Sequence, residues 1–296
     1  MNELCIIPSE EVARIKGLGF LRDKTTKDCF NCRVITRNGK ITAEEIEIIA
    51  KAAKLYGNGE VAMTTRMTIE IQKIPFKNID SLVEYLNKFG LETGGTGPKV
   101  RPVVSCKGTT CQYGLIDTFD LSLEIHNRFY KGYHNVALPH KFKIAVGGCP
   151  NNCVKPDLND IGIMGQKVPV IDLEKCKGCK NCQVINGCPM KACDIKDGKI
   201  FIDLDRCNHC GRCIGKCPFK VFEEYTTGFR IYIGGRYGKK VNRGIALNKI
   251  YLSKEKVLDA IEKIILFYKD NGIKGERFAD TIERIGFETI EKSIIE

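Results

Sequence analysis

The 296-residue sequence has no long apolar run and no segment patterned like a secretion signal. No stretch approaches the roughly 18 apolar residues that a membrane-spanning helix requires. The first residues, MNELCIIPSEE, are acidic and lack the basic and apolar regions of a signal peptide. These absences predict a cytoplasmic protein that does not use a membrane.

Two kinds of ligand motif are also missing. The formal net charge of +11 alone would suit a nucleic-acid partner. However, the sequence has no basic run interleaved with aromatic residues and no helix-turn-helix signal. The stretch GLGFLR at 17–22 is not a glycine-rich turn between a strand and a helix, as a nucleotide-binding fingerprint would be. We therefore expect no nucleic acid, and no direct hydride transfer from a nicotinamide cofactor.

Cysteine, in contrast, is abundant, with 16 in the chain. In a reducing compartment thiols stay free, so this count favours metal ligation over disulfides. Anionic cofactors on these thiolates would also offset the basic charge. Cys29 and Cys32 form a lone CxxC without a partner pair, and with Cys5 they are expected to pack inside the fold.

Eight of the cysteines belong to an internal repeat. VIDLEKCKGCKNC (170–182) aligns with FIDLDRCNHCGRC (201–213), and each half predicts a strand, an acidic turn and three cysteines, followed later by a Cys-Pro step. In two-cluster ferredoxins the triplet of one half and the Cys-Pro of the other bind each [4Fe–4S] cubane, whereas zinc sites use two CxxC pairs. The repeat predicts one cluster on Cys176, Cys179, Cys182 and Cys217, and another on Cys207, Cys210, Cys213 and Cys188.

One spacing in the repeat is unusual. Five residues separate Cys182 from Cys188, where three is usual. Cys193 is therefore an alternative fourth ligand. The Cys-Pro step favours Cys188, which leaves Cys193 as a small buried thiol.

The rest of the chain has an α/β pattern. VAMTTRMTIEI (61–71) alternates along its length and predicts one strand with Arg66 on its polar face. TAEEIEIIAKAAKLYG (42–57) predicts a helix with a capping box of Thr42 and Glu45 and an end at Gly57. A second helix is expected over 78–90.

Further along, the second helix places Leu82, Leu86 and Phe89 on one stripe. GGTGPKVRP (94–102) reads as a linker or as a loop that approaches a ligand closely, and GGRYGKK (234–240) as another glycine-rich loop. Helices are also expected over 115–130, 253–270 and 277–286. Because α/β character resumes after 228, the cysteine repeat is expected to be an insertion.

Several motifs together resemble the sulfite/nitrite reductase hemoprotein family: TTRMTIEI, RPVVSCKGTTC, LPHKFKIAVGGCPNNC and GGR. Within this family the pattern is similar to the catalytic C subunits of anaerobic sulfite reductases, which also carry a ferredoxin insert. The resemblance covers nearly the whole chain and implies an α+β siroheme reductase half-repeat. It implies a ferredoxin-like half domain at 1–92, a siroheme- and cluster-binding domain at 93–165 and 228–296, and an inserted two-cluster ferredoxin domain at 166–227.

The resemblance also implies two further cofactors, siroheme and a third [4Fe–4S] cluster. The third cluster would be held by Cys106, Cys111, Cys149 and Cys153, with Cys153 also bridging to the siroheme iron. The first pair here has four intervening residues, whereas the family pattern has five. Taken alone, the four residues would also fit buried thiols or a zinc site. Glycines 147 and 148 would let the backbone crowd the macrocycle and donate N–H groups to sulfur.

Four cations complete the site that the resemblance implies: Arg66, Arg101, Lys141 and Lys143. They would ring the substrate, hold its oxyanion and supply protons. In KFKIAV the two lysines share one face of an extended segment, and Phe142 and Ile144 take the other. Without the resemblance, each cation would be read as an ordinary solvated charge.

The implied activity is the six-electron reduction of sulfite to sulfide at siroheme, with electrons fed through the two ferredoxin-type clusters. The reduction of nitrite to ammonia uses the same cofactors. A non-catalytic electron-transfer subunit is the alternative from another class. The implied partners are an iron–sulfur subunit and a flavin/NADH subunit, and a homo-oligomer could stand in for the second half that larger relatives contain.

Overall fold

The computed structural model describes residues 7–295, so Cys5 lies outside the described residues. The chain divides into two compact units. The first contains the residues up to Ser105 together with Ser122–Ile144 and Ile265–Gly286, and the second contains Cys106–Leu121, Ala145–Ile264 and the residues from Phe287. None of the helices within 7–295 combines the length and the apolar character of a membrane span.

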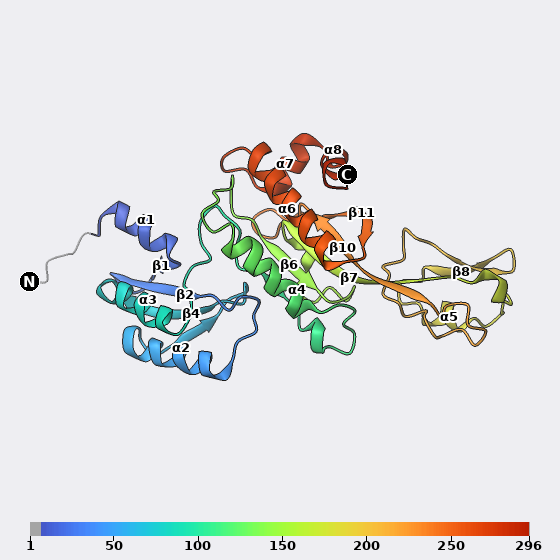
Figure 1. Ribbon diagram of the computed structural model, residues 1–296, viewed down its shortest axis with the longest axis horizontal. Coiled ribbons are helices and arrows are strands. Elements are labelled where there is room, and N and C mark those ends of the chain that lie inside the picture. Colours follow the sequence, from blue (N-terminus) through green and yellow to red (C-terminus); the bar gives the residue numbers. More distant parts are fainter. Residues whose placement is uncertain (1–6, 296) are drawn as a thin grey trace, which may run out of the picture. The chain divides into compact units, whose positions relative to one another are not determined.

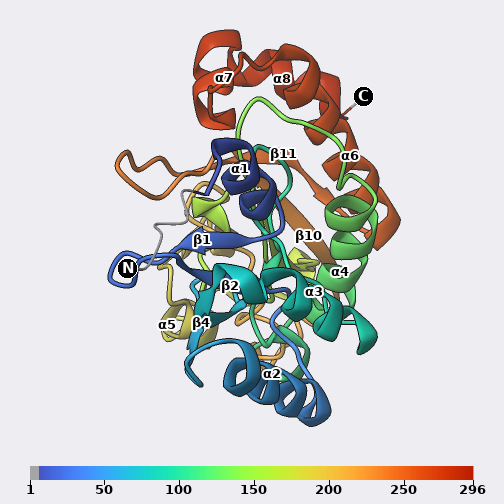
Figure 2. The same cartoon turned by 90° about the vertical axis from the view of Figure 1, so that its left-hand side faces the viewer.

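The first unit is built on an antiparallel sheet with the strand order β1-β2-β4-β3. Its strands are β1 (Phe20–Arg22), β2 (Cys29–Val34), β3 (Val61–Met63) and β4 (Ile69–Pro75), and α1 (Ser9–Gly17), α2 (Ala43–Tyr56) and α3 (Ile79–Lys88) pack on it (Figure 2). The inward-facing residues of these elements form one apolar core. Cys32 is fully buried in this core, which confirms its predicted packing role.

The predicted capping box is confirmed at the start of α2. Thr42 accepts a hydrogen bond from the Glu45 amide at 3.2 Å, and the Glu45 carboxylate accepts one from the Thr42 amide at 2.9 Å. The helix ends at Tyr56, and Gly57 follows as its C-cap, as predicted. These local signals determine both ends of the helix.

The prediction of a single strand over 61–71 is wrong, because the segment is a hairpin of β3 and β4. The Thr64 hydroxyl accepts hydrogen bonds from the amides of Arg66 and Thr68, at 3.3 and 3.2 Å. Met67 adopts a φ of 58°. A side chain that binds nearby backbone amides in this way competes with the strand ladder. Arg66 therefore lies in a turn and not on a strand face.

The stripe predicted on α3 is confirmed only in part. Leu82 and Leu86 are fully buried, but Phe89 is 50% exposed. The helix ends at Lys88, so Phe89 falls off the apolar stripe and its ring lies 5.2 Å from that of Tyr85.

The other predicted helices form within a few residues of their expected bounds. They are α4 (Thr118–Ile125), continued by a π-helical turn at His126–Lys131, then α6 (Lys254–Asn271) and α7 (Phe278–Ile285). The last helix, α8 (Phe287–Ile295), was not predicted. The short strand β5 (Val104–Ser105) ends the N-terminal segment of the first unit.

The second unit has neighbouring strands in the order β11-β10-β7-β6. They are β6 (Ile144–Gly147), β7 (Ile161–Pro169), β10 (Tyr225–Ile233) and β11 (Ile245–Tyr251). β7 and β10 pair along their whole length, from Ile161 opposite Ile233 to Pro169 opposite Tyr225. The cysteine repeat lies between the paired ends of these two strands, and Figure 1 shows them running out to it.

The repeat itself contains a short helix, α5 (Gln183–Gly187), and a hairpin of β8 (Cys193–Lys196) and β9 (Lys199–Ile202). The strand predicted before the second triplet corresponds to β9. The strand predicted before the first triplet is wrong, because β7 ends at Pro169 and Leu173–Lys175 form a 3-10 turn.

Candidate active site

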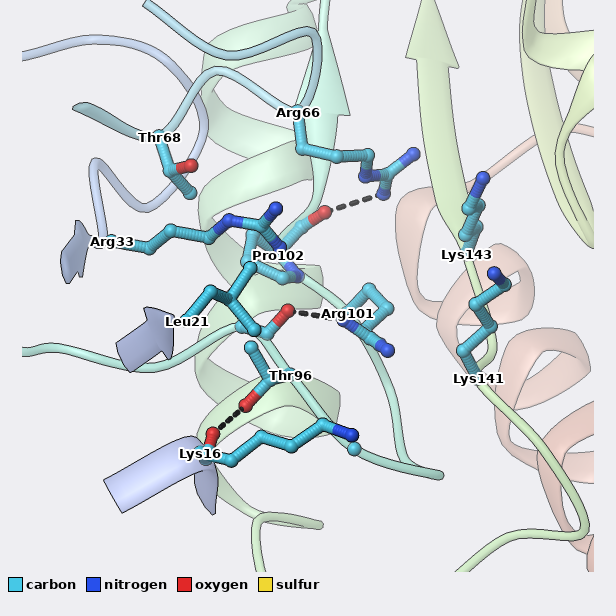
Figure 3. Close-up of a pocket in the computed structure, with 12 residues that line it drawn as sticks. Lys16, Leu21, Arg33, Arg66, Thr68, Thr96, Arg101, Pro102, Lys141 and Lys143 are labelled. Atoms are coloured by element: carbon cyan, nitrogen blue, oxygen red, sulfur yellow. Dashed lines mark hydrogen bonds between the residues drawn. The ribbon is translucent and has the colours of Figure 1, made fainter. Parts of the chain in front are cut away.

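The first unit contains a cavity of about 320 Å³ that is lined by cations (Figure 3). All four predicted substrate-binding cations line it, and two more do so that were not predicted. The six are Lys16, Arg33, Arg66, Arg101, Lys141 and Lys143. Of the described residues that line the cavity, none is acidic. The cavity is therefore suited to an anion.

Arg66 reaches the cavity from the turn between β3 and β4. Its Nη2 donates to the carbonyl of Pro102 at 2.5 Å and to that of Ile144 at 3.3 Å. These contacts fix the guanidinium with backbone acceptors.

Arg101 lies beside Arg66 at the end of the glycine-rich loop. Its amide donates to the carbonyl of Phe142 at 2.8 Å, and its Nη1 donates to the carbonyl of Gly95. Burial, followed by the neighbouring charge of Arg33, lowers the pKa of Arg101 to about 10. The group is still protonated at neutral pH, and it is poorly solvated, so an incoming anion would be bound strongly.

The glycine-rich loop at 94–102 was expected to be a linker or a loop that approaches a ligand. Gly95 and Gly97 line the cavity, which supports the second reading. Gly95 has a φ of 77°, and a Cβ there would lie 2.9 Å from the Pro102 ring. Its amide donates to the hydroxyl of buried Tyr130 at 3.1 Å, which fixes the loop.

Lys141 and Lys143 reach the cavity from the segment before β6. Phe142 between them is fully buried, and its ring lies 5.3 Å from that of Tyr268 and 5.4 Å from that of Phe278. This anchoring holds both lysines on the other side of the chain. The predicted alternation along KFKIAV is confirmed.

Sequence reasoning missed Lys16 and Arg33. Arg33 alternates on β2 with the buried residues Cys32 and Val34, and it forms an ion pair with Glu70 at 3.4 Å. That alternation could have placed it opposite the core. Lys16 lies in the last turn of α1, and no sequence pattern marks it.

The second unit brings together the four cysteines predicted to hold the third cluster. Burial raises the pKa of Cys149, and the charges of Cys106, Cys153 and Cys111 raise it further, so all four thiols lie near one another. Cys153 is exposed, whereas the other three are half-buried. The predicted N–H donation is observed at Gly148, whose amide lies 3.1 Å from the Cys106 sulfur.

The second triplet of the repeat lies around a small cavity of about 20 Å³. The cysteines lining it are Cys207, Cys210, Cys213, Cys188 and Cys193. Burial raises the pKa of Cys213 to about 11 and that of Cys193 to about 12. Both candidates for the fourth ligand are thus near the triplet, and Cys193 is only 8% exposed.

The first triplet packs against the β8–β9 hairpin. The amide of Ile200 donates to the Cys176 sulfur at 3.3 Å, and Cys176, Cys182 and Cys217 share the apolar core of the repeat. Among residues 7–295, no group of three or more His, Cys, Asp and Glu side chains is arranged to hold a single metal ion. Thiols packed around this core are the donor type that iron–sulfur clusters use.

Two family models match the chain. The model of the nitrite and sulphite reductase 4Fe-4S domain matches residues 96–296, and that of the nitrite/sulfite reductase ferredoxin-like half domain matches 22–89. The chain belongs to the siroheme sulfite/nitrite reductase family. The first model, of a 4Fe-4S domain, spans all twelve cysteines that the sequence analysis assigned to clusters.

Individual relatives agree with this assignment. A coenzyme F420-dependent sulfite reductase of Methanocaldococcus jannaschii is 35% identical over 247 residues, which are 82% of this chain but 38% of that enzyme. The C subunit of the anaerobic sulfite reductase of Salmonella typhimurium is 26% identical over 251 residues, 78% of this chain and 72% of that protein. The crystal structure of dissimilatory sulfite reductase I is similar in fold, with a TM-score of 0.69 at 23% identity over 90% of this chain and 69% of that one.

Proposed function

We propose that this protein reduces sulfite to sulfide, in a six-electron reaction, at a siroheme coupled to a [4Fe–4S] cluster and fed by two ferredoxin-type clusters. The observation that supports it most is the cavity lined by six cations, with no acidic residue among the described lining residues. Sulfite is a small dianion and siroheme carries several carboxylates, so both fit a cavity of this charge.

The cysteines provide the donors for the clusters. Cys106, Cys111, Cys149 and Cys153 would hold the coupled cluster, and Cys153 would also help to hold the siroheme. The triplets at 176–182 and 207–213, completed by Cys217 and Cys188, would hold the two ferredoxin-type clusters. When bound, siroheme would supply a Lewis-acidic iron and the electrons for S–O cleavage.

The protein's own cations would orient the substrate and supply protons. Arg66 and Arg101, fixed by backbone carbonyls, would orient the oxyanion. Lys141 and Lys143 would hold protons at Nζ and donate them to the departing oxygen, which takes up two protons and leaves as water. Solvent would return the protons to both lysines before the next oxygen leaves. The poorly solvated charges would offset the negative charge that develops on these oxygens.

The proposal extends to the electron donors. An iron–sulfur subunit and a flavin/NADH subunit would supply electrons, as the resemblance to C subunits implies. The chain spans 38% of the length of the F420-dependent relative. A homo-oligomer would supply the second half found in larger relatives.

Anaerobically purified, iron-replete protein tests the proposal. We expect a chlorin-like red absorption band, about twelve irons per chain, and sulfide formation from sulfite with an artificial reductant. About eight irons and no tetrapyrrole would contradict it and leave an electron-transfer subunit. If the protein reduces nitrite to ammonia faster than it reduces sulfite to sulfide, the activity belongs to the nitrite reductases of the family.

A substitution separates the coupled centre from the other clusters. Cys153→Ser should abolish the magnetic coupling between heme and cluster and leave both ferredoxin-type clusters intact. Cys29→Ser, which changes a half-buried thiol of β2 outside every predicted ligand set, should leave all the spectra unchanged. Equal loss of all three clusters in Cys153→Ser would contradict this partition of the cysteines.

A further inference from the structure

The loop at 234–244 connects β10 to β11, contains the glycine-rich stretch 234–240, and has no role in the site described above. Arg236 and Asn242 pair across it, with two N–H···O bonds of 2.8 Å. A Cβ at Gly235 would lie 2.4 Å from the carbonyl oxygen of Asp157. Glycine at 235 therefore lets the loop lie directly on the backbone around Asp157.

Asp157 is a buried carboxylate that links this loop to the loop of Cys149 and Cys153. It lies in the 3-10 turn Pro156–Leu158 and is 6% exposed. Its Oδ1 accepts from Nδ2 of Asn152 at 2.9 Å, and its Oδ2 accepts from Nη1 of Arg243 at 2.5 Å. Its carbonyl accepts from the amide of Gly244 at 2.7 Å. Both carboxylate oxygens are thus used, one by each loop.

Asn152 determines the path of the chain between the two cysteines. It has a φ of 57°, in the left-handed region that asparagine adopts more readily than most side chains. Its amide donates to the carbonyl of Cys149 at 3.3 Å, which forms the turn leading to Cys153. The hydrogen bond to Asp157 holds this turn in place from outside.

We propose that Asp157, held by Arg243, is a positioning residue for the Cys153 thiolate. It acts through Asn152 and touches neither substrate nor cofactor. The inference rests on the proposed function, in that the turn is taken to carry cluster-ligating thiolates. The Arg243 side chain is 75% exposed and that of Asp157 is 9% exposed. A surface residue therefore forms an ion pair with a buried carboxylate.

Four variants of the holoprotein test this clamp, the hydrogen-bonded set of Asn152, Asp157 and Arg243. Asp157→Asn, Arg243→Ala and Asn152→Gly each remove one of its hydrogen bonds, and glycine keeps the left-handed backbone available. Arg243→Lys keeps a single donor to the carboxylate. Glu276→Gln is the matched control, because Glu276 is paired with Arg284 at 2.9 Å with its side chain 12% exposed, outside the cysteine loops.

The readouts are electron paramagnetic resonance of the reduced holoprotein, the midpoint potential of the third cluster, and thermal unfolding. We expect the first three variants to shift the midpoint potential of the third cluster and to weaken or abolish the heme–cluster coupling. The iron content should stay at about twelve per chain, that is, about four for each of three cubanes. Arg243→Lys should restore the wild-type signal. Glu276→Gln should lower the unfolding temperature with no spectral change.

Wild-type spectra in Asp157→Asn and Asn152→Gly would overturn the proposal. So would spectral changes in Glu276→Gln equal to those in Asp157→Asn, since both would then reflect general destabilisation. If Asp157→Asn does not fold, the exposed Arg243→Ala and the Asn152→Gly variant decide the matter. Protein without tetrapyrrole, whose third-cluster potential still shifts in these variants, would contradict the proposed function and leave the clamp in place.

Discussion

The backbone amide of Gly148 donates a hydrogen bond to the Cys106 sulfur, at 3.1 Å. A hydrogen bond of this kind lowers the charge density on a thiolate and raises the potential of the cluster that it binds. The same position is crowded, because a Cβ at 148 would lie 2.8 Å from the Gly108 Cα and 3.4 Å from the Cys106 sulfur. Glycine therefore permits both the hydrogen bond and the close approach of the two cysteine loops.

If Cys106, Cys111, Cys149 and Cys153 hold the proposed third cluster, Gly148→Ala should damage that cluster selectively. The backbone at Gly108 would have to move, which costs about 1–3 kcal/mol and displaces Cys106. Iron analysis should fall from about twelve toward about eight per chain. Gly17→Ala, where a Cβ meets nothing within 4 Å, should keep all the iron. Full iron content in Gly148→Ala would show that the loops tolerate the shift.

Arg101→Gln should lower kcat/KM for sulfite by about 10²–10³ near pH 8, as expected when a fixed donor is removed from an oxyanion site. Because the pKa of Arg101 is lowered to about 10, the wild-type protein loses this charge as the pH rises through that value. The ratio of kcat/KM between the wild-type protein and the variant should then decrease toward one. Lys51→Gln, on an exposed position of α2, is the control. A ratio that stays constant from pH 8 to 11 would contradict the assigned role.

Cys188→Ser and Cys193→Ser should separate the two candidates for the fourth ligand. The Cys-Pro step favours Cys188, so its replacement should remove one cluster, about four irons. Cys193→Ser should keep the iron and lower stability by about 1 kcal/mol or more, because a hydroxyl is buried in place of a thiol. Iron analysis and thermal unfolding measure both effects, and the opposite pattern would assign the cluster to Cys193.

His126→Phe should stabilise the first unit. His126 is fully buried, and neither ring nitrogen has a hydrogen-bond partner among the described residues. Removing two unsatisfied polar atoms should raise the free energy of unfolding by about 1–3 kcal/mol at pH 7. The aromatic ring can keep the stacking on Tyr130, at 4.9 Å between centroids. Urea titrations at pH 7 measure the gain.

The same variant tests a pH dependence. Burial, then the charges of Lys131 and Arg37 against that of Glu92, lower the pKa of His126 from 6.5 to about 4. The unfolded chain therefore binds a proton at a higher pH than the folded one, and the wild-type protein loses stability as the pH falls from 6.5 toward 4. In His126→Phe, the free energy of unfolding should not show this decrease between pH 6.5 and pH 4. Parallel slopes in the two proteins would contradict the lowered pKa.

Sequence patterns predicted the features that short-range physics determines. The capping box of Thr42 and Glu45 needs only four residues, and the alternation of Lys141 and Lys143 around buried Phe142 follows from the geometry of an extended chain. The errors have local causes that a hydropathy pattern does not contain. At Arg66, the Thr64 hydroxyl turned an apparently continuous strand into a hairpin.

The cavity itself could be predicted only in part. Arg33 and Lys16 line it because β2 and α1 bring them there, and those placements depend on packing between elements distant in the sequence. Likewise, the spacing of the cysteines indicated clusters, but the contact of Asp157 with both Asn152 and Arg243 joins segments 86 residues apart. No repeat or motif encodes such a contact.

The cysteine repeat leaves the sheet after Pro169 and returns at Tyr225, and these two residues face each other across β7 and β10. Because the chain leaves the sheet and returns to it at two paired residues, deleting the intervening stretch would leave two adjacent strand ends that a tight turn can join. In evolutionary terms the stretch is a cassette: it can be gained, lost or exchanged in one genetic event while the host hairpin keeps its register.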